Sequence, residues 1–285
     1  MAPDVQLDNV DLIVNRNSLR KLLNFAAGKR QEPFRMTIHM VKNTLFISRN
    51  ERNARLMIRG VYDSGYGHNF ERAFTKPAHD LDHSSSHHRV VQYRLGHLKC
   101  VVQFEVDAYY EGDIESSTVV NTGELVEDLA ASMTQLTIDK PRPDSLEKGA
   151  TNVHQKGRFI SSSSLAEVKI RKAASISEAI PQLWFGRTPY LLTGRHVQGV
   201  VHSVRCSHVE PKFRNWEAAN QGKLRKLVNL LAELARIASE MRGGTAILVC
   251  QSRGAPLQVF EVKKETTVLP ASIIAKHWSQ VAEKD

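Results

Sequence analysis

The sequence predicts an α/β or α+β fold in which mixed central β-sheets are flanked by helices. Two observations support this prediction: short runs of alternating apolar and polar residues, which indicate strands, and a stretch of helical periodicity at 223–241. The length of 285 residues, with 41% hydrophobic and 24% charged residues, is sufficient for one large globular core. We expect a single domain over 1–285, with an insertion at about 111–164.

The N-terminal part of the chain predicts a helix, a loop and several strands. Residues 18–28 are typical of a short helix with Ser18 as its N-cap and Gly28 as its terminator. A helix or turn is expected to begin at 65–71, and the polar stretch 76–89 is expected to be an exposed loop. Alternation between turn residues predicts four strands: 34–41, 44–48, 90–93 and 98–110.

The composition changes between 111 and 164, where acidic residues, Ser, Thr, Pro and Gly dominate and 123–136 is the one amphipathic helix candidate. Beyond this segment, apolar runs predict five strands: 165–170, 190–193, 199–204, 245–251 and 257–263. Periodicity and end signals predict three helices: 178–186, 223–241 and 271–281. The alternation of strands and helices favours the mixed fold class.

Charge and cysteine content restrict the partners and the compartment. A net charge of +9 and a pI near 9.5 favour an anionic partner such as nucleic acid, although many basic proteins simply have basic surfaces. Cys100, Cys206 and Cys250 have no zinc-type spacing, and their odd number argues against a disulfide framework. We see no signal peptide and no apolar run of about 20 residues. We therefore expect a soluble protein of the nucleus or cytoplasm, with no membrane partner.

Two charged triplets interrupt apolar, strand-like runs. Glu105-Val-Asp107 and Glu167-Val-Lys169 each place their charged residues at i and i+2, on one face of a strand. If the two strands are adjacent, three carboxylates and one ammonium share a patch. Such a patch binds divalent cations through hard oxygen ligands. The triplets therefore suggest metal-dependent phosphodiester cleavage.

The alternative interpretation of these triplets is a solvated strand face or a set of structural ion pairs. Triplets of this kind occur often by chance. Here, however, Glu105 follows Val-Val-Gln-Phe and Glu167 lies between Leu165 and Ile170. A charge within an apolar strand is unfavourable unless it is paired or bound to a metal. The context therefore favours a site.

The order of motifs resembles that of the DXO-type decapping nucleases, a branch of the PD-(D/E)XK nuclease superfamily. Gly67-His-Asn-Phe-Glu71 has the spacing of the first acidic motif of that family, with His68 in place of an apolar residue. Both triplets match its Glu-apolar-Asp and Glu-apolar-Lys motifs. A catalytic-site glutamine is matched by Gln182, in Gln182-Leu-Trp-Phe-Gly-Arg-Thr-Pro, followed by Leu-Leu-Thr-Gly194. The resemblance implies a PD-(D/E)XK-like nuclease core.

The resemblance also implies a role for each matched residue. Lys169 would orient a water molecule or neutralise developing charge, and Gln182 would hold the water or a phosphate oxygen. The alternative for Gln182 is an ordinary surface glutamine. One or two Mg²⁺ or Mn²⁺ ions, most simply two, would be bound by Glu71, Glu105, Asp107, Glu167 and the Val168 carbonyl.

Basic, aromatic and histidine residues around the motifs are less informative. Arg171, Arg187 and Arg195 lie close to the motifs in sequence and would grip a nucleic-acid backbone, or they are ordinary surface cations. Trp184 and Phe185 are more typical of core anchors than of base-stacking platforms. A further group looks like a flexible loop rather than a metal site: His79, His83, His87 and His88.

The leading functional hypothesis is a metal-dependent RNA 5′-end hydrolase. By resemblance, it would decap or remove pyrophosphate from incompletely capped, triphosphate or NAD-type 5′ ends, with 5′–3′ exoribonuclease activity as a further expectation. RNA 5′ ends are the expected substrate, and an exoribonuclease is a candidate partner protein. Two alternatives remain: a non-catalytic RNA-binding or partner-stabilising protein of the same fold, and a DNA-directed nuclease of the superfamily.

Overall fold

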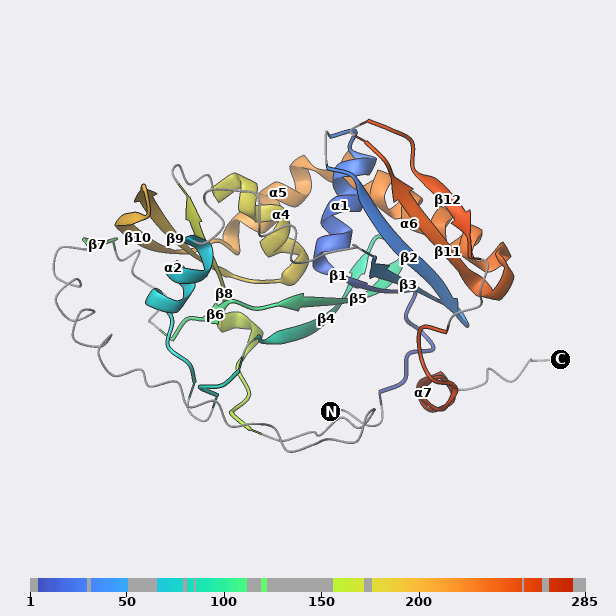
Figure 1. The fold of residues 1–285 in the computed structure, drawn as a ribbon, viewed down its shortest axis with the longest axis horizontal. Coiled ribbons are helices and arrows are strands. Elements are labelled where there is room, and N and C mark those ends of the chain that lie inside the picture. The colour runs from blue at the N-terminus through green and yellow to red at the C-terminus, as the bar shows by residue number, and fades with distance from the viewer. Residues whose placement is uncertain are drawn as a thin grey trace.

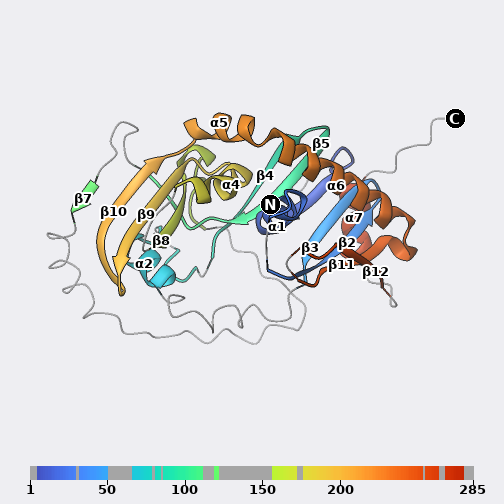
Figure 2. The same cartoon turned by 90° about the horizontal axis from the view of Figure 1, so that it is seen from above.

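The computed structural model describes residues 5–29, 32–50, 66–78, 81–84, 86–111, 119–121, 156–171, 176–252, 254–262 and 267–278. The predicted class is confirmed, because two mixed sheets are flanked by helices (Figures 1 and 2). The helix candidate at 123–136 lies outside the described residues. No helix in the described ranges is long and apolar enough to cross a membrane.

Seven strands form the first sheet, in which the short β1 is parallel to β3 and β5 and the other pairs are antiparallel. A tight turn joins β2 to β3, with Lys42 at φ 54°. In spatial order the strands are β12 (Gln258–Glu261), β11 (Thr245–Cys250), β2 (Phe34–Val41), β3 (Thr44–Arg49), β1 (Leu12–Asn15), β5 (Leu98–Glu105) and β4 (His88–Leu95).

Five strands form the second sheet, which lies beside the first (Figure 2). Only β8 and β9 are parallel in it, and the remaining pairs are antiparallel. In spatial order the strands are β6 (Ala108–Tyr109), β8 (Leu165–Arg171), β9 (Tyr190–Val197), β10 (Val200–His208) and β7 (Val119–Asn121).

One large hydrophobic core unites the helices on one face of the first sheet. It includes Leu19 of α1 (Arg16–Ala26), Leu183 of α4 (Ile176–Gly186), Phe213 of α5 (Pro211–Ala219) and Leu231 of α6 (Gln221–Glu240). These side chains pack on alternate residues of the strands, such as Leu45 and Ile47 of β3. Because α4 and α5 belong to this core, the core also fixes the position of the second sheet.

The opposite face of the first sheet carries a smaller core. Trp278, just after α7 (Ala271–His277), packs on Phe46 of β3 with a ring-centroid distance of 5.8 Å. Its indole Nε1 donates a hydrogen bond to Thr44 Oγ1 at 2.9 Å. Phe46 points away from its neighbours Leu45 and Ile47, as strand alternation requires. The chain end near α7 therefore covers the face that α1 and α6 leave open.

Several boundaries differ from the sequence predictions. The N-cap of α1 is Asn15 rather than Ser18: its Oδ1 accepts a hydrogen bond from the Ser18 N–H at 2.8 Å, so Ser18 is already inside the helix. The expected strand 98–110 is two strands, because β5 ends at Glu105 and β6 begins at Ala108 in the other sheet. The strand β1 and the helix α5 were not predicted, since a four-residue strand and a nine-residue amphipathic helix give weak periodic signals.

Candidate active site

The two charged triplets meet where the chain crosses from one sheet to the other. Glu105 is the last residue of β5, and Asp107 lies in the two-residue link to β6. β6 pairs with β8 in the register Ala108↔Ala166 and Tyr109↔Leu165, which brings Asp107 alongside Glu167. The strands β5 and β8, which carry Glu105 and Glu167, lie in different sheets, and the β6–β8 pairing makes the triplets neighbours. The triplets are brought together by the crossing itself.

Asp107 is tied to both residues that follow Glu167. Its Oδ2 accepts a hydrogen bond from the Val168 N–H at 2.8 Å and lies 3.7 Å from Lys169 Nζ. The backbone contact fixes the carboxylate against β8, while the ammonium balances part of its charge. The Val168 side chain points to the other face, into a small core, as alternation requires. The role of the Val168 backbone carbonyl as a metal ligand stays a prediction.

Glu167 is almost fully buried, with 2% of its surface exposed. Lys169 and Gln182 both donate hydrogen bonds to its Oε1. Arg16 Nη1 lies 2.9 Å from its Oε2. A buried carboxylate needs such partners because it has lost its water. The predicted Gln182 is thus in the same site as Glu167 and Lys169.

Arg16 and Arg20 of α1 complete this group, and neither was predicted. Arg16 is itself 8% exposed, lies over the Phe104 ring at 5.0 Å, and donates a hydrogen bond from Nη2 to the Glu105 carbonyl at 3.2 Å. Arg20 Nη1 donates to Gln182 Oε1 at 2.7 Å. A signal was present in the sequence: two arginines four residues apart begin a helix, where the helix dipole disfavours cations.

Helix α2 (Tyr66–Phe74) carries Glu71 to the second sheet. The neighbouring Phe70 is buried against Val168 and Val204. Gly194 of β9 makes this contact possible, because a Cβ there would lie 2.5 Å from the Phe70 ring. The glycine of the Leu-Leu-Thr-Gly segment therefore provides the space into which α2 docks.

The electrostatics of the carboxylates show that they lie within range of one another. Burial, followed by the charge of Glu167, raises the pKa of Asp107 to about 7. Burial and then the carboxylates of Glu105 and Glu167 raise the pKa of Glu71, against the opposing effect of His68. Burial opposes ionisation of Glu167 too, but Lys169 and Arg16 hold its pKa below the ordinary value. The four carboxylates outnumber the cations that contact them, Arg16 and Lys169.

The donor chemistry of this group fits a hard divalent cation. Four carboxylates within electrostatic range supply oxygen ligands of the kind that Mg²⁺ and Mn²⁺ prefer. In the structure, the two carboxylate oxygens of Glu167 are already in contact with Lys169, Gln182 and Arg16. Across the described ranges, no three His, Cys, Asp or Glu side chains stand in ligating geometry. A cation would therefore exchange places with Lys169 or Arg16 at these oxygens.

The predicted basic residues divide into two groups. Arg171 of β8 and Arg195 of β9 are direct cross-strand partners on adjacent parallel strands, and Arg171 also contacts Glu178. Arg187 lies elsewhere, where its guanidinium contacts the rings of Tyr93 and Trp184. The predicted core role of Trp184 and Phe185 is confirmed, since both are buried. His83, His87 and His88 are exposed, and His79 lies outside the described residues.

Comparison with known proteins identifies the family. A family model described as "Domain of unknown function (DUF8563)" matches residues 1–278. The chain belongs to the DUF8563 family. No curated protein shows a significant sequence match.

The fold of this DUF8563 protein is that of the DXO-type decapping nucleases, as the motif order implied. S. pombe Rai1 in complex with 3′-FADP is similar with a TM-score of 0.55 and 12% sequence identity, over 89% of this chain and 72% of that chain. Candida albicans Rai1 in complex with pU5-Mn²⁺ is similar with a TM-score of 0.51 and 12% identity, over 88% and 69%. This DUF8563 protein therefore has the Rai1 fold at low sequence identity.

Proposed function

We propose that this protein is a metal-dependent hydrolase of RNA 5′ ends, active in the nucleus or cytoplasm. One observation carries the proposal: Asp107, Glu167, Lys169 and Gln182 form a single contact network where the two sheets meet. The fold shared with Rai1 supports it, as do the ligands named for the two Rai1 complexes. Decapping or pyrophosphate removal is the reaction class, with 5′–3′ exonuclease activity as an extension.

The residues at this site would have different roles in the cleavage of a phosphodiester or pyrophosphate bond. The carboxylates of Glu71, Glu105, Asp107 and Glu167 would hold one or two Mg²⁺ or Mn²⁺ ions. Bound there, such ions lower the pKa of water and stabilise the oxygens of an in-line displacement. Lys169, released from Glu167, would place its ammonium beside the charge that develops on phosphorus.

The remaining partners orient the site and the substrate. Gln182 is held at one end by Arg20 and at the other by Glu167, so its amide has a fixed direction for a water or a phosphate oxygen. Arg171 lies on the same strand as Lys169, and Arg195 is its cross-strand partner on β9. The two arginines would grip backbone phosphates and add salt dependence without base specificity.

The test is hydrolysis by the purified protein with Mn²⁺ of three RNAs that differ only at the 5′ end: triphosphate, NAD-capped and incompletely capped. We expect release of the terminal group from at least one RNA. The near-isosteric variant Asp107→Asn should lose at least roughly 100-fold in rate, because it removes one carboxylate from the cluster. Glu111→Gln removes an exposed carboxylate outside the cluster and should retain wild-type activity.

The alternatives predict different results in the same experiment. Equal rates on DNA of the same sequence would support a DNA-directed nuclease. Inactivity together with no Mn²⁺ binding by calorimetry would support a non-catalytic RNA-binding role. Full activity of Asp107→Asn would exclude the cluster as the reacting site.

A further inference from the structure

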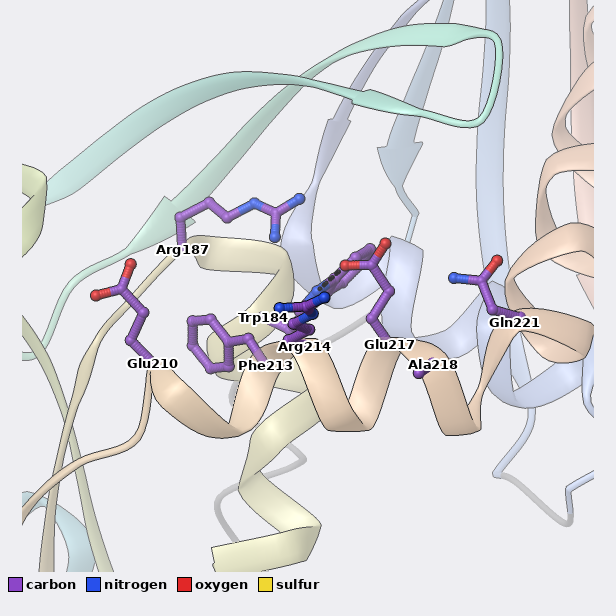
Figure 3. Close-up of a pocket in the computed structure, with 8 residues that line it drawn as sticks. All are labelled: Trp184, Arg187, Glu210, Phe213, Arg214, Glu217, Ala218 and Gln221. Atoms are coloured by element: carbon purple, nitrogen blue, oxygen red, sulfur yellow. Dashed lines mark hydrogen bonds between the residues drawn. The ribbon is translucent and has the colours of Figure 1, made fainter.

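Two clefts meet around the C-terminal end of α4. The first, of about 560 Å³, lies between α4 and α5 (Figure 3). The second, of about 300 Å³, lies between α6 and the turn that joins β4 to β5. Both are lined by Trp184, Arg187, Glu217 and Gln221, so they form one depression, which we call the α4–α6 cleft. Its size suits a small organic ligand.

The α4–α6 cleft is separate from the carboxylate cluster. Neither of its two parts is lined by a residue of the cluster. Gln182 faces Glu167, whereas Trp184 follows two residues later, about 200° around the α-helix. The two sites therefore lie on opposite sides of α4.

The cleft carries an excess of positive charge. Its two carboxylates already have partners: Glu217 accepts a hydrogen bond from Trp184 Nε1 at 3.3 Å, and Glu210 lies 3.4 Å from His208 Nε2. Its four arginines form no salt bridge with any carboxylate in the described part of the chain. They are Arg94, Arg187, Arg214 and Arg225. Unpaired arginines around a cleft attract an anion.

Arg187 is held in one position before any ligand arrives. Its guanidinium carbon lies 4.4 Å from the centre of the Tyr93 ring and 4.5 Å from that of Trp184. The two ring centres are 6.3 Å apart, so the rings do not sandwich the guanidinium but restrain it from two adjacent sides. The planar N–H donors of a guanidinium match the oxygens of a phosphate. Arg187 also adopts φ 51°, which is unfavourable for a residue with a side chain. Strain of this kind is often found at binding sites.

We propose that the α4–α6 cleft binds an organic phosphate of nucleotide size. The in-plane donors of Arg187 hold the phosphate, and Arg214 adds a second positive charge from α5. The organic part lies beside Phe213 and the exposed Ala218, apolar residues of the lining that Figure 3 labels. A bare inorganic anion would use only the arginines, so the apolar part of the lining favours a larger molecule.

The test is calorimetric titration of the full chain with AMP and ADP in the presence of EDTA. Without divalent metal, the carboxylate cluster repels phosphates, which favours binding at the cleft. We expect one site per chain with a Kd below about 1 mM for at least one nucleotide, and at least tenfold weaker binding of inorganic phosphate and of adenosine. Absence of nucleotide binding, or equal binding of adenosine, would overturn the proposal.

Variants locate the site within the molecule. Arg187→Lys keeps the charge but loses the planar donors, and exposed Arg214→Gln loses the charge; each should weaken nucleotide binding by roughly tenfold. Lys226→Gln removes an exposed charge from α6 outside the cleft and should leave the affinity within about twofold. Asp107→Asn should also leave it unchanged. Weakening by Asp107→Asn, with none by Arg214→Gln, would place the nucleotide at the carboxylate cluster and contradict the proposal.

Discussion

Arg16 shows how one side chain can secure a site at the meeting of two sheets. It projects from α1, which packs on the first sheet, and reaches Glu167 in the second. Its other amino group holds the carbonyl of Glu105. Both partners are residues of the predicted site. Arg16 therefore connects the two triplets independently of any metal ion.

Arg16→Met should reduce the free energy of unfolding by about 3 kcal/mol, because it leaves a nearly buried carboxylate without one of its cations. Chemical denaturation measures this loss. The double variant Arg16→Met with Glu167→Gln should lose less unfolding free energy than the sum of the two single variants. The carboxylate charge that Arg16→Met leaves unpaired is absent from the double variant. Arg236→Met is the matched control, because Arg236 also meets two carboxylates but in an exposed position. Similar losses in both arginine variants would argue against a buried pair.

His39 of β2 makes stability dependent on pH. It is buried, and its Nδ1 lies 3.1 Å from Thr245 Oγ1, whose hydroxyl donates to the Gly243 carbonyl. The neutral ring therefore donates its Nδ1 proton to Thr245. Burial lowers the pKa of His39 below the ordinary value. As the pH falls, the unfolded chain binds a proton first, at about pH 6.5.

The stability contributed by His39 is thus complete above about pH 6.5 and is lost as the pH falls from there through the lower pKa of the folded protein. His39→Asn, which keeps a donor near Nδ1, should flatten this part of the stability curve. Urea unfolding of both proteins between pH 5 and 8 makes the comparison (~0.5 pH steps suffice for a one-proton transition). If the unfolding free energies of the wild type and the variant change in parallel with pH, His39 does not make this contribution.

At the scale of elements, α2 and β9 form the contact that places Glu71. The Phe70 ring occupies the space that a side chain at position 194 would need. Gly194, which lies just beyond the predicted strand 190–193, is thus a docking position within β9. Its effect on the site passes through a helix more than 100 residues earlier in the chain.

Gly194→Ala should therefore displace Phe70 and with it Glu71. We expect a loss of about 1–3 kcal/mol in unfolding free energy and a fall in hydrolysis rate. Gly222→Ala is the control, because a Cβ in that turn of α6 meets nothing within 4 Å and should stabilise the helix by up to about 1 kcal/mol. Thermal unfolding and activity assays compare the two variants. Equal stability and equal hydrolysis rates would refute the docking role of Gly194.

The same scale shows what the sequence can predict. Long periodic elements such as α6, and strands bounded by turns such as β2 and β3, give strong local signals, and their predicted bounds lie close to those observed. The crossing at Val106 and Asp107 gives no such signal, because apolar alternation continues through it. Arg16 and Arg20 were missed for a related reason. Their partners, Glu167 and Gln182, are far away in the sequence, and only the tertiary structure brings them into contact. The triplets were found through strand alternation, and Gln182 was found through its place in the motif order.

At the scale of the whole molecule, the carboxylate cluster lies between the two sheets, so binding there would affect the stability of both. Mn²⁺ should raise the unfolding free energy by about 2.7 kcal/mol at 100 times its Kd, in one cooperative transition. Scanning calorimetry with and without Mn²⁺ measures this. Asp107→Asn should abolish most of the shift, whereas Glu240→Gln, an exposed carboxylate on α6, should retain it. A shift that survives in Asp107→Asn would locate the metal elsewhere.

The short β6–β8 pair has a consequence for how relatives of this protein can be recognised. The Tyr110 N–H donates a hydrogen bond to the Ser164 carbonyl at 2.7 Å, so the residues that follow β6 and those that precede β8 lie next to each other. Outside β7, the length of chain between these two points can change while the β6–β8 pairing still brings Asp107 to Glu167. Spacing between the motifs is therefore free to drift among homologues. Strand pairing is the more durable signature of common descent.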